Sequence, residues 1–189
     1  AFLGEGRLFE AVVDPDRDPH VEAANMVGLT DYVRPDGNVE SRRQRGKTFN
    51  FSVLYGAGIN SLTEHFHVSE AEARRMLDAY HRAYPEIGDL QRQVRWALED
   101  RGYVKTPWGR RHRIDKRQAY KGVNAIVQGT AADILKDAVI RLHAEHAPLI
   151  LCVHDELLFH VQEQMAEALK RRVIEAMTDH PDINKFVPL

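Results

Sequence analysis

Residues 42–56 read R-R-Q-R-G-K-T-F-N-F-S-V-L-Y-G, and this stretch predicts an α-helix that ends at Gly56. Glycine directly after a helical run is a common stop signal. Four residues recur along the stretch at i, i+4 steps: Arg43, Lys47, Phe51 and Tyr55. Residues with this spacing share one face of a helix. Phe49 and Val53 lie one turn apart on another face, where they can dock on a hydrophobic core.

A helix face with two cations at its start and two aromatic rings at its end suits a nucleotide. Cations hold phosphate oxygens through charge-assisted hydrogen bonds, and rings offer a stacking surface for a base. The alternative interpretation is an ordinary amphipathic surface helix with a solvated basic face.

The pattern R-x3-K-x3-F-x3-Y-G resembles the nucleotide-binding helix of family A (polymerase I-like) DNA polymerases. The resemblance implies that Arg43 and Lys47 bind the triphosphate of an incoming dNTP. It also implies that Phe51 lies beside the sugar and Tyr55 near the templating base. The family often has glycine where this chain has Ser52, a difference that leaves the helix prediction intact.

His20 is a further candidate ligand of the nucleotide. The segment D-P-H-V-E-A-A around it is similar to the D-I-H-x-x-T-A stretch of the same family, where the histidine reaches the nucleotide phosphates. The alternative is that His20 is only a residue at the start of a helix.

Composition and charge are those of a globular chain with a basic region. The 189 residues are 43% hydrophobic and carry a formal net charge of −2. Residues 101–121 nevertheless hold eight lysines and arginines against Asp115 alone, which is typical of a nucleic-acid-binding surface.

The rest of the composition points to a reducing compartment. Cys152 is the one cysteine, which excludes an intrachain disulfide. No apolar run approaches the roughly 18 residues of a membrane span, and no signal peptide is visible. We therefore expect no membrane partner and a cytoplasmic location. The resemblance implies a bacterial or phage-infected cell. The lack of an initiator methionine suggests a cut inside a longer protein.

Residues 57–106 predict two helices and a strand. Ala57 and Gly58 break the helical pattern, and His65 and His67 are interpreted as loop or surface histidines. A helix begins after Ser69 with the capping box S-E-A-E, and Pro85 begins the next helix, which runs to about residue 101. Residues 103–106 then read as a short strand.

A turn at Trp108 and Gly109 precedes Arg110 and Arg111, which are placed to grip a phosphate backbone. The alternative is a solvated basic loop. The run is similar to the family pattern G-Y-V-x-T-x-x-G-R-R, and the resemblance implies that both arginines contact DNA.

Residues 116–146 are strongly helical in pattern. Gly129 and Thr130 predict a break between two helices, with Thr130 as N-cap and Asp133 at the capping-box position. Asn124 and Gln128 lie one turn apart and can read a minor groove, because their amides both donate and accept. The resemblance implies that both contact primer–template DNA, and helix-capping amides are the alternative.

Residues 148–161 predict a β-hairpin with His154, Asp155 and Glu156 at its turn. Carboxylates at the tip of two buried strands would need a neutralising cation. The run closely matches the family's V-H-D-E-L palm motif. The resemblance implies that Asp155 is a metal ligand and that His154 and Glu156 support the primer end and the active site. Residues 164–178 predict an amphipathic helix.

Together these patterns predict an α+β fold that is mostly helical. The resemblance implies a palm-proximal segment at 1–19, a fingers subdomain at 20–115 and a partial palm at 116–189. It also implies template-dependent addition of dNMP from dNTP to a primer 3′-hydroxyl, assisted by two Mg²⁺ ions, with a monomeric enzyme and primer–template DNA and dNTP as partners.

The two-ion scheme needs a second carboxylate, which the family supplies from a D-Y-S-x-I-E-L-R motif expected before residue 1. Asp31 and Tyr32 imitate the start of that motif but lie in a turn-rich connector, so we discount them. We therefore expect this chain by itself to be inactive. Two alternatives remain: a non-catalytic nucleic-acid-binding module derived from a polymerase, and a structural or regulatory interaction domain.

Overall fold

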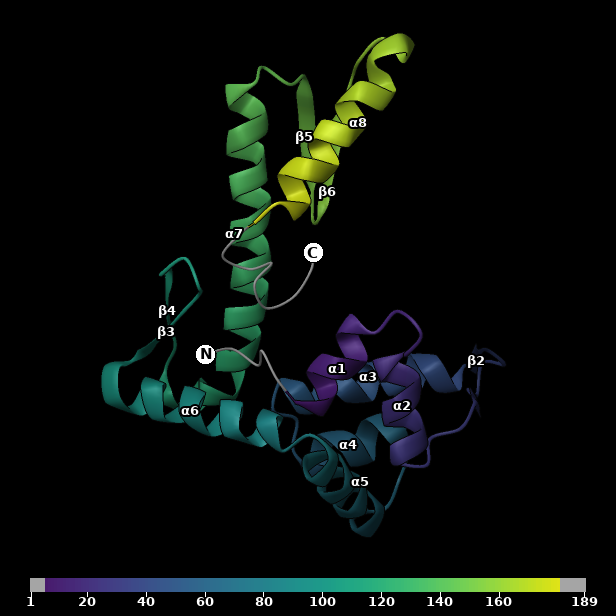
Figure 1. Ribbon diagram of the computed structural model, residues 1–189. Coiled ribbons are helices and arrows are strands. Elements are labelled where there is room, and N and C mark those ends of the chain that lie inside the picture. Colours follow the sequence, from purple (N-terminus) through teal and green to yellow (C-terminus); the bar gives the residue numbers. More distant parts are fainter. Residues whose placement is uncertain (1–5, 181–189) are drawn as a thin grey trace. The chain divides into compact units, whose positions relative to one another are not determined.

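The computed structural model describes residues 6–180. Internal packing divides the chain into two compact units, and Figure 1 shows the elements of both. The first unit comprises residues 1–104 and 112–125, and the second comprises residues 105–111 and 126–189. The predicted N-terminal cut and the last nine residues fall outside the described part of the chain. The predicted functional subdivision at residues 19 and 115 stays a prediction, because compact packing and function are separate criteria.

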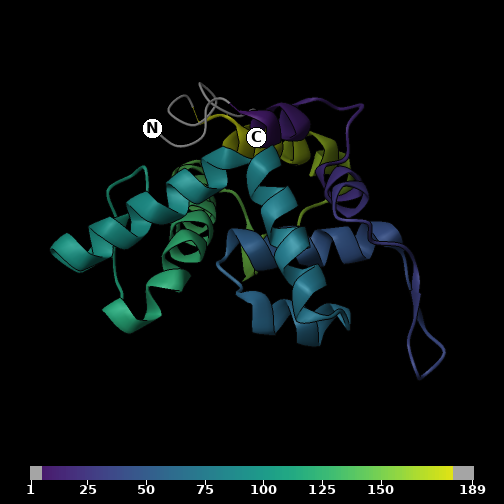
Figure 2. The ribbon, with the colours of Figure 1, turned by 90° about the horizontal axis from the view of Figure 1, so that it is seen from below.

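The first unit is almost wholly helical (Figures 1 and 2). Its helices are α1 (Arg7–Val13), α2 (Pro19–Met26), α3 (Arg42–Leu54), α4 (Ile59–Phe66), α5 (Glu70–Ala83), α6 (Pro85–Arg101) and the 3₁₀ helix η1 (Lys116–Lys121). Two short strands, β1 (Tyr32–Val33) and β2 (Val39–Glu40), form an antiparallel hairpin within the predicted connector.

Helix α3 begins and ends where the sequence predicts. The Ser41 hydroxyl accepts a hydrogen bond from the Gln44 N–H at 3.2 Å and caps the start. Tyr55 ends the helix, and Gly56 follows with a φ of 84°, a left-handed conformation that glycine adopts without a steric penalty. Phe49 and Val53 are fully buried, as the second face of the helix predicts.

The core of the first unit is an aromatic cluster between α3, α4 and α5. The Phe49 ring meets the rings of Phe66 and Tyr80 edge-to-face, at 5.6 Å between centroids in both cases. Tyr80 and Tyr84 meet in the same way at 5.0 Å. Edge-to-face pairs add to the stabilisation from burial alone. This cluster holds α3 by its buried face and leaves the face with the two cations and two rings outward.

Two local signals from the sequence are confirmed. The Ser69 hydroxyl accepts from the Glu72 N–H, and the Glu72 carboxylate accepts from the Ser69 N–H, so the capping box is complete. Pro85 is the first residue of α6, and Gly102 ends that helix with a φ of 75°. Both signals depend on neighbours within one helical turn, which is why the sequence reveals them.

Between Gly58 and Ser69 the structure contains a helix that was not predicted, whereas the predicted break at Ala57 and Gly58 and the surface exposure of His65 and His67 are confirmed. Residues 59–66 form α4, so His65 lies in the last helical turn and His67 caps the helix end with a φ of 55°. Leu62 and Phe66 anchor this short helix in the core, with exposed fractions of 0% and 4%. Ile59, Leu62 and Phe66 recur at i, i+3 and i+7, a helical spacing that could have predicted α4 from the sequence. A helix of eight residues is marginal by itself, so its packing on the core is what stabilises it.

The second unit contains most of α7 (Gly122–Ala144), the strands β5 (Leu149–Val153) and β6 (Glu156–Phe159), and α8 (Glu163–Thr178). A further hairpin joins β3 (Tyr103–Lys105) to β4 (Arg111–Arg113), and the boundary between the units runs through it. The predicted helix at 164–178 is confirmed as α8. Among the described residues, no helix is both long and apolar enough to cross a membrane.

The predicted break at Gly129 and Thr130 is wrong, because α7 runs without interruption through both residues. Thr130 does not cap a helix start, since its hydroxyl donates back to the Ile126 carbonyl at 2.7 Å. Asp133 does not close a capping box either. It accepts a hydrogen bond from the Thr106 hydroxyl at 2.7 Å and pairs with Arg110.

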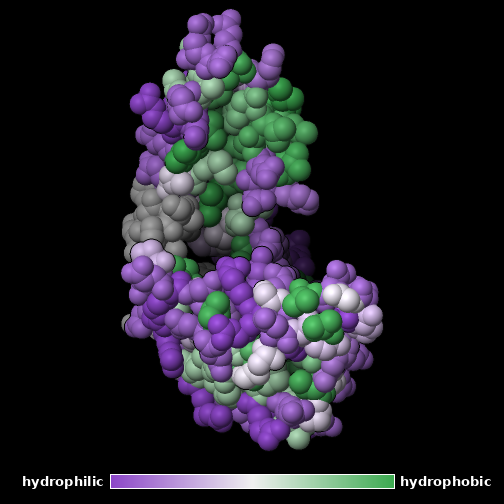
Figure 3. All heavy atoms as spheres, turned by 90° about the vertical axis from the view of Figure 1, so that its right-hand side faces the viewer, coloured by the Kyte–Doolittle hydropathy of each residue, from purple (hydrophilic) through white to green (hydrophobic). Residues whose placement is uncertain are grey.

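The β5–β6 hairpin covers a small core formed by Ala138, Leu142 and Ala176. Its opposite face is exposed and apolar, and Figure 3 shows a hydrophobic patch in this unit. The exposed apolar residues of the hairpin are Ile150, Leu151, Val153 and Leu158. The predicted hairpin is therefore confirmed, but the prediction that both of its strands are buried is wrong.

Candidate nucleotide-binding and acidic sites

The predicted face of α3 exists as a continuous surface. The rings of Phe51 and Tyr55 stack with centroids 5.8 Å apart and planes 17° from parallel. Lys47 is exposed one turn before Phe51, and the Arg43 side chain is 56% exposed one turn before that. The i, i+4 spacing therefore places two cations and two stacked rings along one side of the helix, as the sequence predicts.

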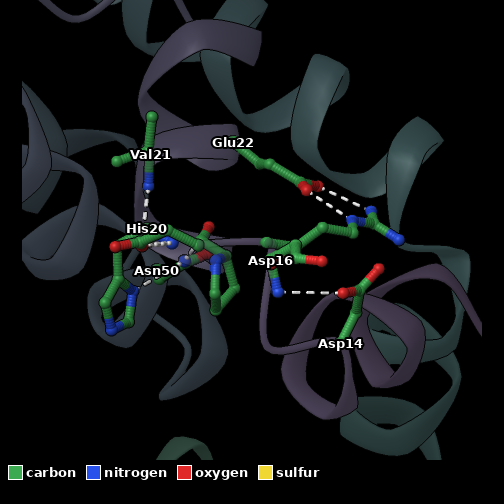
Figure 4. Close-up of polar contacts among 9 residues, drawn as sticks. Asp14, Asp16, His20, Val21, Glu22 and Asn50 are labelled. Atoms are coloured by element: carbon green, nitrogen blue, oxygen red, sulfur yellow. Dashed lines mark hydrogen bonds and ion pairs between the residues drawn. The ribbon is translucent and has the colours of Figure 1, made fainter.

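His20 belongs to the same surface, although it lies on α2. Its ring centroid is 5.7 Å from that of Phe51. Helix α2 begins with Asp18 as N-cap, whose carboxylate accepts from the N–H groups of His20 and Val21 at 2.9 and 3.1 Å. This cap fixes the position of His20 on the first turn of α2, so the backbone carries the imidazole to α3 (Figure 4).

Gly46 allows α2 to come this close to α3. A Cβ atom built on Gly46 would lie 2.0 Å from the carbonyl oxygen of His20 and 2.9 Å from Cβ of Ala24. Neither distance is possible for a real side chain, so only glycine fits at this helix crossing. A glycine in the interior of a helical pattern is the signal that could have predicted the close approach.

Charge on this surface is partly balanced. Nε of Arg43 lies 2.5 Å from Oδ2 of Asp18, and the hydrogen bond from Arg43 holds the pKa of that carboxyl below its ordinary value. Burial lowers the pKa of His20, and the charges of Arg43 and Lys47 lower it further, whereas Asp18 opposes them. His20 is therefore a neutral imidazole at pH 7.

The acidic site lies at the turn between β5 and β6. Val153 pairs with Glu156, so His154 and Asp155 form a two-residue loop. His154 has a φ of 55°, and all three side chains of the H-D-E run are exposed. The sequence predicts that these carboxylates lie at the tip of buried strands, where a cation would have to neutralise them. In the structure both carboxylates are exposed to solvent, so no desolvation cost has to be offset by a cation.

A metal site is not assembled by the described residues, among which no group of three or more His, Cys, Asp or Glu side chains could hold an ion. Asp155 and Glu156 are adjacent carboxylates in solvent. They do not by themselves fit the two Mg²⁺ ions that the resemblance implies, since a two-ion site needs carboxylates that bridge ions about 4 Å apart.

The predicted DNA contacts are distributed over α7 and the hairpin before it. Asn124 is half-buried and Gln128 is exposed, one turn apart on the uninterrupted α7. Arg110 is paired with Asp133, whose side chain is 10% exposed, and Arg111 is exposed on β4. The sequence did not reveal that Arg110 is held by a nearly buried carboxylate 23 residues away.

A family model for DNA polymerase family A matches residues 1–189, the whole chain. The chain belongs to DNA polymerase family A. It is 29% identical over 181 residues to a DNA polymerase of Mycobacterium phage D29, covering 95% of this chain and 29% of that protein. It is 35% identical over 192 residues to the thermostable DNA polymerase I of Thermus filiformis, covering 94% and 23%.

A solved structure is also similar to this family A chain: the POL domain of Pol1 from M. smegmatis, in complex with DNA primer-template and dNTP. The TM-score is 0.76 with 29% sequence identity, and the match covers 96% of this chain and 34% of that one. The α+β, mostly helical fold is thereby confirmed. The chain spans less than a third of the length of the phage D29 and Thermus filiformis polymerases.

Proposed function

We propose that this chain provides the dNTP-binding surface and the acidic primer-end turn of a DNA-directed DNA polymerase. The reaction is attack of a primer 3′-hydroxyl on the α-phosphate of a dNTP, which forms a phosphodiester and releases pyrophosphate. The observation that carries the proposal is the convergence of His20 with the cations and stacked rings of α3. Packing alone does not require that combination on one exposed surface.

Each group on this surface has a role in the proposed reaction. Lys47 and Arg43 neutralise the charge of the triphosphate, which lets it lie against the protein and stabilises charge on the leaving pyrophosphate. His20 donates a hydrogen bond to a phosphate oxygen. Phe51 and Tyr55 form an apolar stack for the sugar and the base pair, where a flat surface excludes water.

The remaining groups are proposed to hold DNA. Asn124 and Gln128 offer amides to the minor groove, Arg110 and Arg111 lie in the basic hairpin near phosphates, and His154 supports the primer end. Primer–template DNA in a monomeric complex is the proposed partner. The solved structure of the Pol1 domain is a complex with DNA primer-template and dNTP, which supports the proposal of both ligands.

Asp155 is a proposed ligand of Mg²⁺, with Glu156 beside it. When bound, the ions would activate the primer hydroxyl and stabilise the pyrophosphate. The described residues do not complete a two-ion site. We propose instead that the 189-residue chain alone does not extend a primer.

Binding of dATP to the 189-residue chain, measured by equilibrium dialysis in magnesium chloride, tests the nucleotide surface. Lys47→Ala removes one charge-assisted contact worth roughly 1.5–3 kcal/mol, so the Kd should rise about ten- to a hundredfold. Lys170→Ala is the matched control, because Lys170 is an exposed lysine on α8. It should leave the Kd unchanged.

A gel-shift assay with primer–template DNA shows whether the exposed face of α3 binds the nucleotide or the DNA. If the chain binds DNA but Lys47→Ala weakens DNA binding as much as dATP binding, α3 faces DNA and the assignment of the surface is wrong. Primer extension by the unmodified chain that is lost in Asp155→Ala would refute the proposed inactivity.

A further inference from the structure

Asn50 lies on α3 one residue before Phe51, and its side chain is only 6% exposed. Its Nδ2 atom lies 2.9 Å from the carbonyl oxygen of Pro19 and 3.1 Å from Nδ1 of His20 (Figure 4). The side chain therefore bridges from α3 to the first turn of α2. The nucleotide surface described above does not include it.

The contact with Pro19 fixes which way the Asn50 amide points. A backbone carbonyl can only accept a hydrogen bond, so the amide atom facing it must be the NH₂ group. Reversing the amide would set its oxygen against the carbonyl of Pro19, where two acceptors face each other and that hydrogen bond is lost. The observed orientation holds even though it leaves the buried Oδ1 of Asn50 without a partner in the described protein.

The same orientation determines the proton on His20. The Asn50 NH₂ group has two hydrogens, one for Pro19 and one for His20, and it has no lone pair to offer. Nδ1 of His20 must then be the acceptor, which places the imidazole proton on Nε2. Nε2 has no hydrogen-bond partner among the described residues, so its N–H can serve a ligand.

The surroundings of the imidazole also favour its neutral form. A proton on Nδ1 would point at the Asn50 NH₂ group, and burial and the cations Arg43 and Lys47 also lower the pKa of His20. Asp18, which precedes α2, is the group that opposes them. His20 is thus held neutral as well as oriented.

We propose that Asn50 is a positioning residue that fixes the His20 imidazole with its proton on Nε2, so that this N–H donates to a phosphate oxygen of the nucleotide on α3. The inference rests on the proposed dNTP-binding surface for its ligand. The hydrogen-bond geometry between Asn50, Pro19 and His20 stands independently of it.

Nitrogen-15 NMR of the imidazoles in the 189-residue chain tests the geometry directly, with the His20 signal identified by its loss in His20→Gln. In the unmodified protein above pH 7, His20 should be almost wholly the Nε2–H tautomer and should titrate below 6.5, its ordinary pKa. An Nδ1–H tautomer in the unmodified protein would overturn the inference, with no variant required.

Asn50→Asp replaces the NH₂ donor with a carboxylate acceptor of the same shape. The proton of His20 should move to Nδ1, and its pKa should rise above that of the unmodified protein. Asn60→Asp makes the same change at an exposed position on α4 and should alter neither property. A His20 tautomer unchanged in a folded Asn50→Asp protein contradicts the proposal.

A double-mutant cycle on the Kd for dATP connects the geometry to binding. His20→Gln and Asn50→Asp should each weaken binding roughly ten- to a hundredfold, the value of one hydrogen bond to a charged group, and together no more than either alone. Effects that multiply in the double variant would show that Asn50 acts only on packing. If dATP does not bind the unmodified chain, the proposed function fails while the tautomer result still decides the role of Asn50.

Discussion

Gly46→Ala tests whether α2 and α3 lie as close together as the nucleotide surface requires. The added methyl group would lie 2.0 Å from the His20 carbonyl oxygen, and the relaxed C···O contact is about 3.3 Å. The obstacle is backbone rather than a flexible side chain, so the two helices must separate. That movement also lengthens the bonds from Asn50 to Pro19 and His20, now 2.9 and 3.1 Å, beyond hydrogen-bond range.

The expected magnitude follows from opposing contributions. Overpacking costs roughly 1–3 kcal/mol, and each of the two lost hydrogen bonds costs about 1 kcal/mol. Alanine is a better helix former than glycine by about 1 kcal/mol, which offsets part of the cost. The free energy of unfolding should therefore fall by roughly 2–4 kcal/mol.

Urea unfolding monitored by far-UV circular dichroism measures this change. Gly88→Ala in α6 is the matched control, because the nearest atom to its new Cβ is a side-chain nitrogen of Arg92 at 3.4 Å. There the gain in helix propensity should dominate, and stability should rise by up to about 1 kcal/mol. If Gly46→Ala is as stable as the unmodified protein while Gly88→Ala behaves as expected, the close packing of α2 on α3 is refuted.

Three further predictions use the same unfolding assay. Ser69→Ala removes the capping box of α5 and should cost about 1 kcal/mol, and an unchanged midpoint would mean that the cap is not formed in solution. His154→Gly should stabilise the β5–β6 turn by up to about 1 kcal/mol, because glycine adopts a φ of 55° without the steric penalty of a Cβ; a loss of stability would contradict the turn geometry. Acid should weaken the protein in two windows, since burial depresses the pKa of His20 and Arg43 depresses that of Asp18. Each group stabilises the folded protein fully above its ordinary pKa, 6.5 for His20 and 3.8 for Asp18, and this stabilisation is lost as pH falls through the depressed value. In a plot of the free energy of unfolding against pH, His20→Gln should flatten the slope below pH 6.5, and Asp18→Asn should flatten the slope below pH 3.8.

The sequence by itself determined the features that depend on residues within one helical turn or one hairpin. The i, i+4 spacing from Arg43 to Tyr55 places four side chains on one face whatever α3 packs against. The capping box at Ser69 and the start of α6 at Pro85 likewise depend on local backbone groups. The resemblance to family A polymerases rests on local motifs such as the Arg43–Tyr55 pattern and the H-D-E run, and it is confirmed by the match over the whole chain.

Tertiary structure determined the outcome at positions where the residues of a local signal contact partners far away in the sequence. Asp133 and Thr130 have the residue types of a helix start, yet Asp133 is engaged by Thr106 and Arg110, 27 and 23 residues earlier. Because Asp133 is held by these two residues and the Thr130 hydroxyl bonds to the Ile126 carbonyl, no capping box forms and α7 continues through Gly129. Helix α4 depends on tertiary structure in another way, because burial of Leu62 and Phe66 stabilises an amphipathic helix of eight residues that would be marginal by itself.

The proposed nucleotide-binding surface depends both on local sequence patterns and on tertiary packing. Its α3 residues can be predicted from spacing, but the orientation of His20 depends on Asn50, 30 residues later, and on the space that Gly46 leaves for α2. Asn50 carries no charge or aromatic ring, so no chemical pattern marks it in the sequence. Gly46 is marked as a glycine inside a helical pattern, but the sequence does not show which element packs against it. Their importance arises from the close packing of α2 on α3: the Asn50 amide nitrogen lies 2.9 Å from the Pro19 carbonyl oxygen, and a Cβ on Gly46 would lie 2.0 Å from the His20 carbonyl oxygen. Only the packed structure determines such distances.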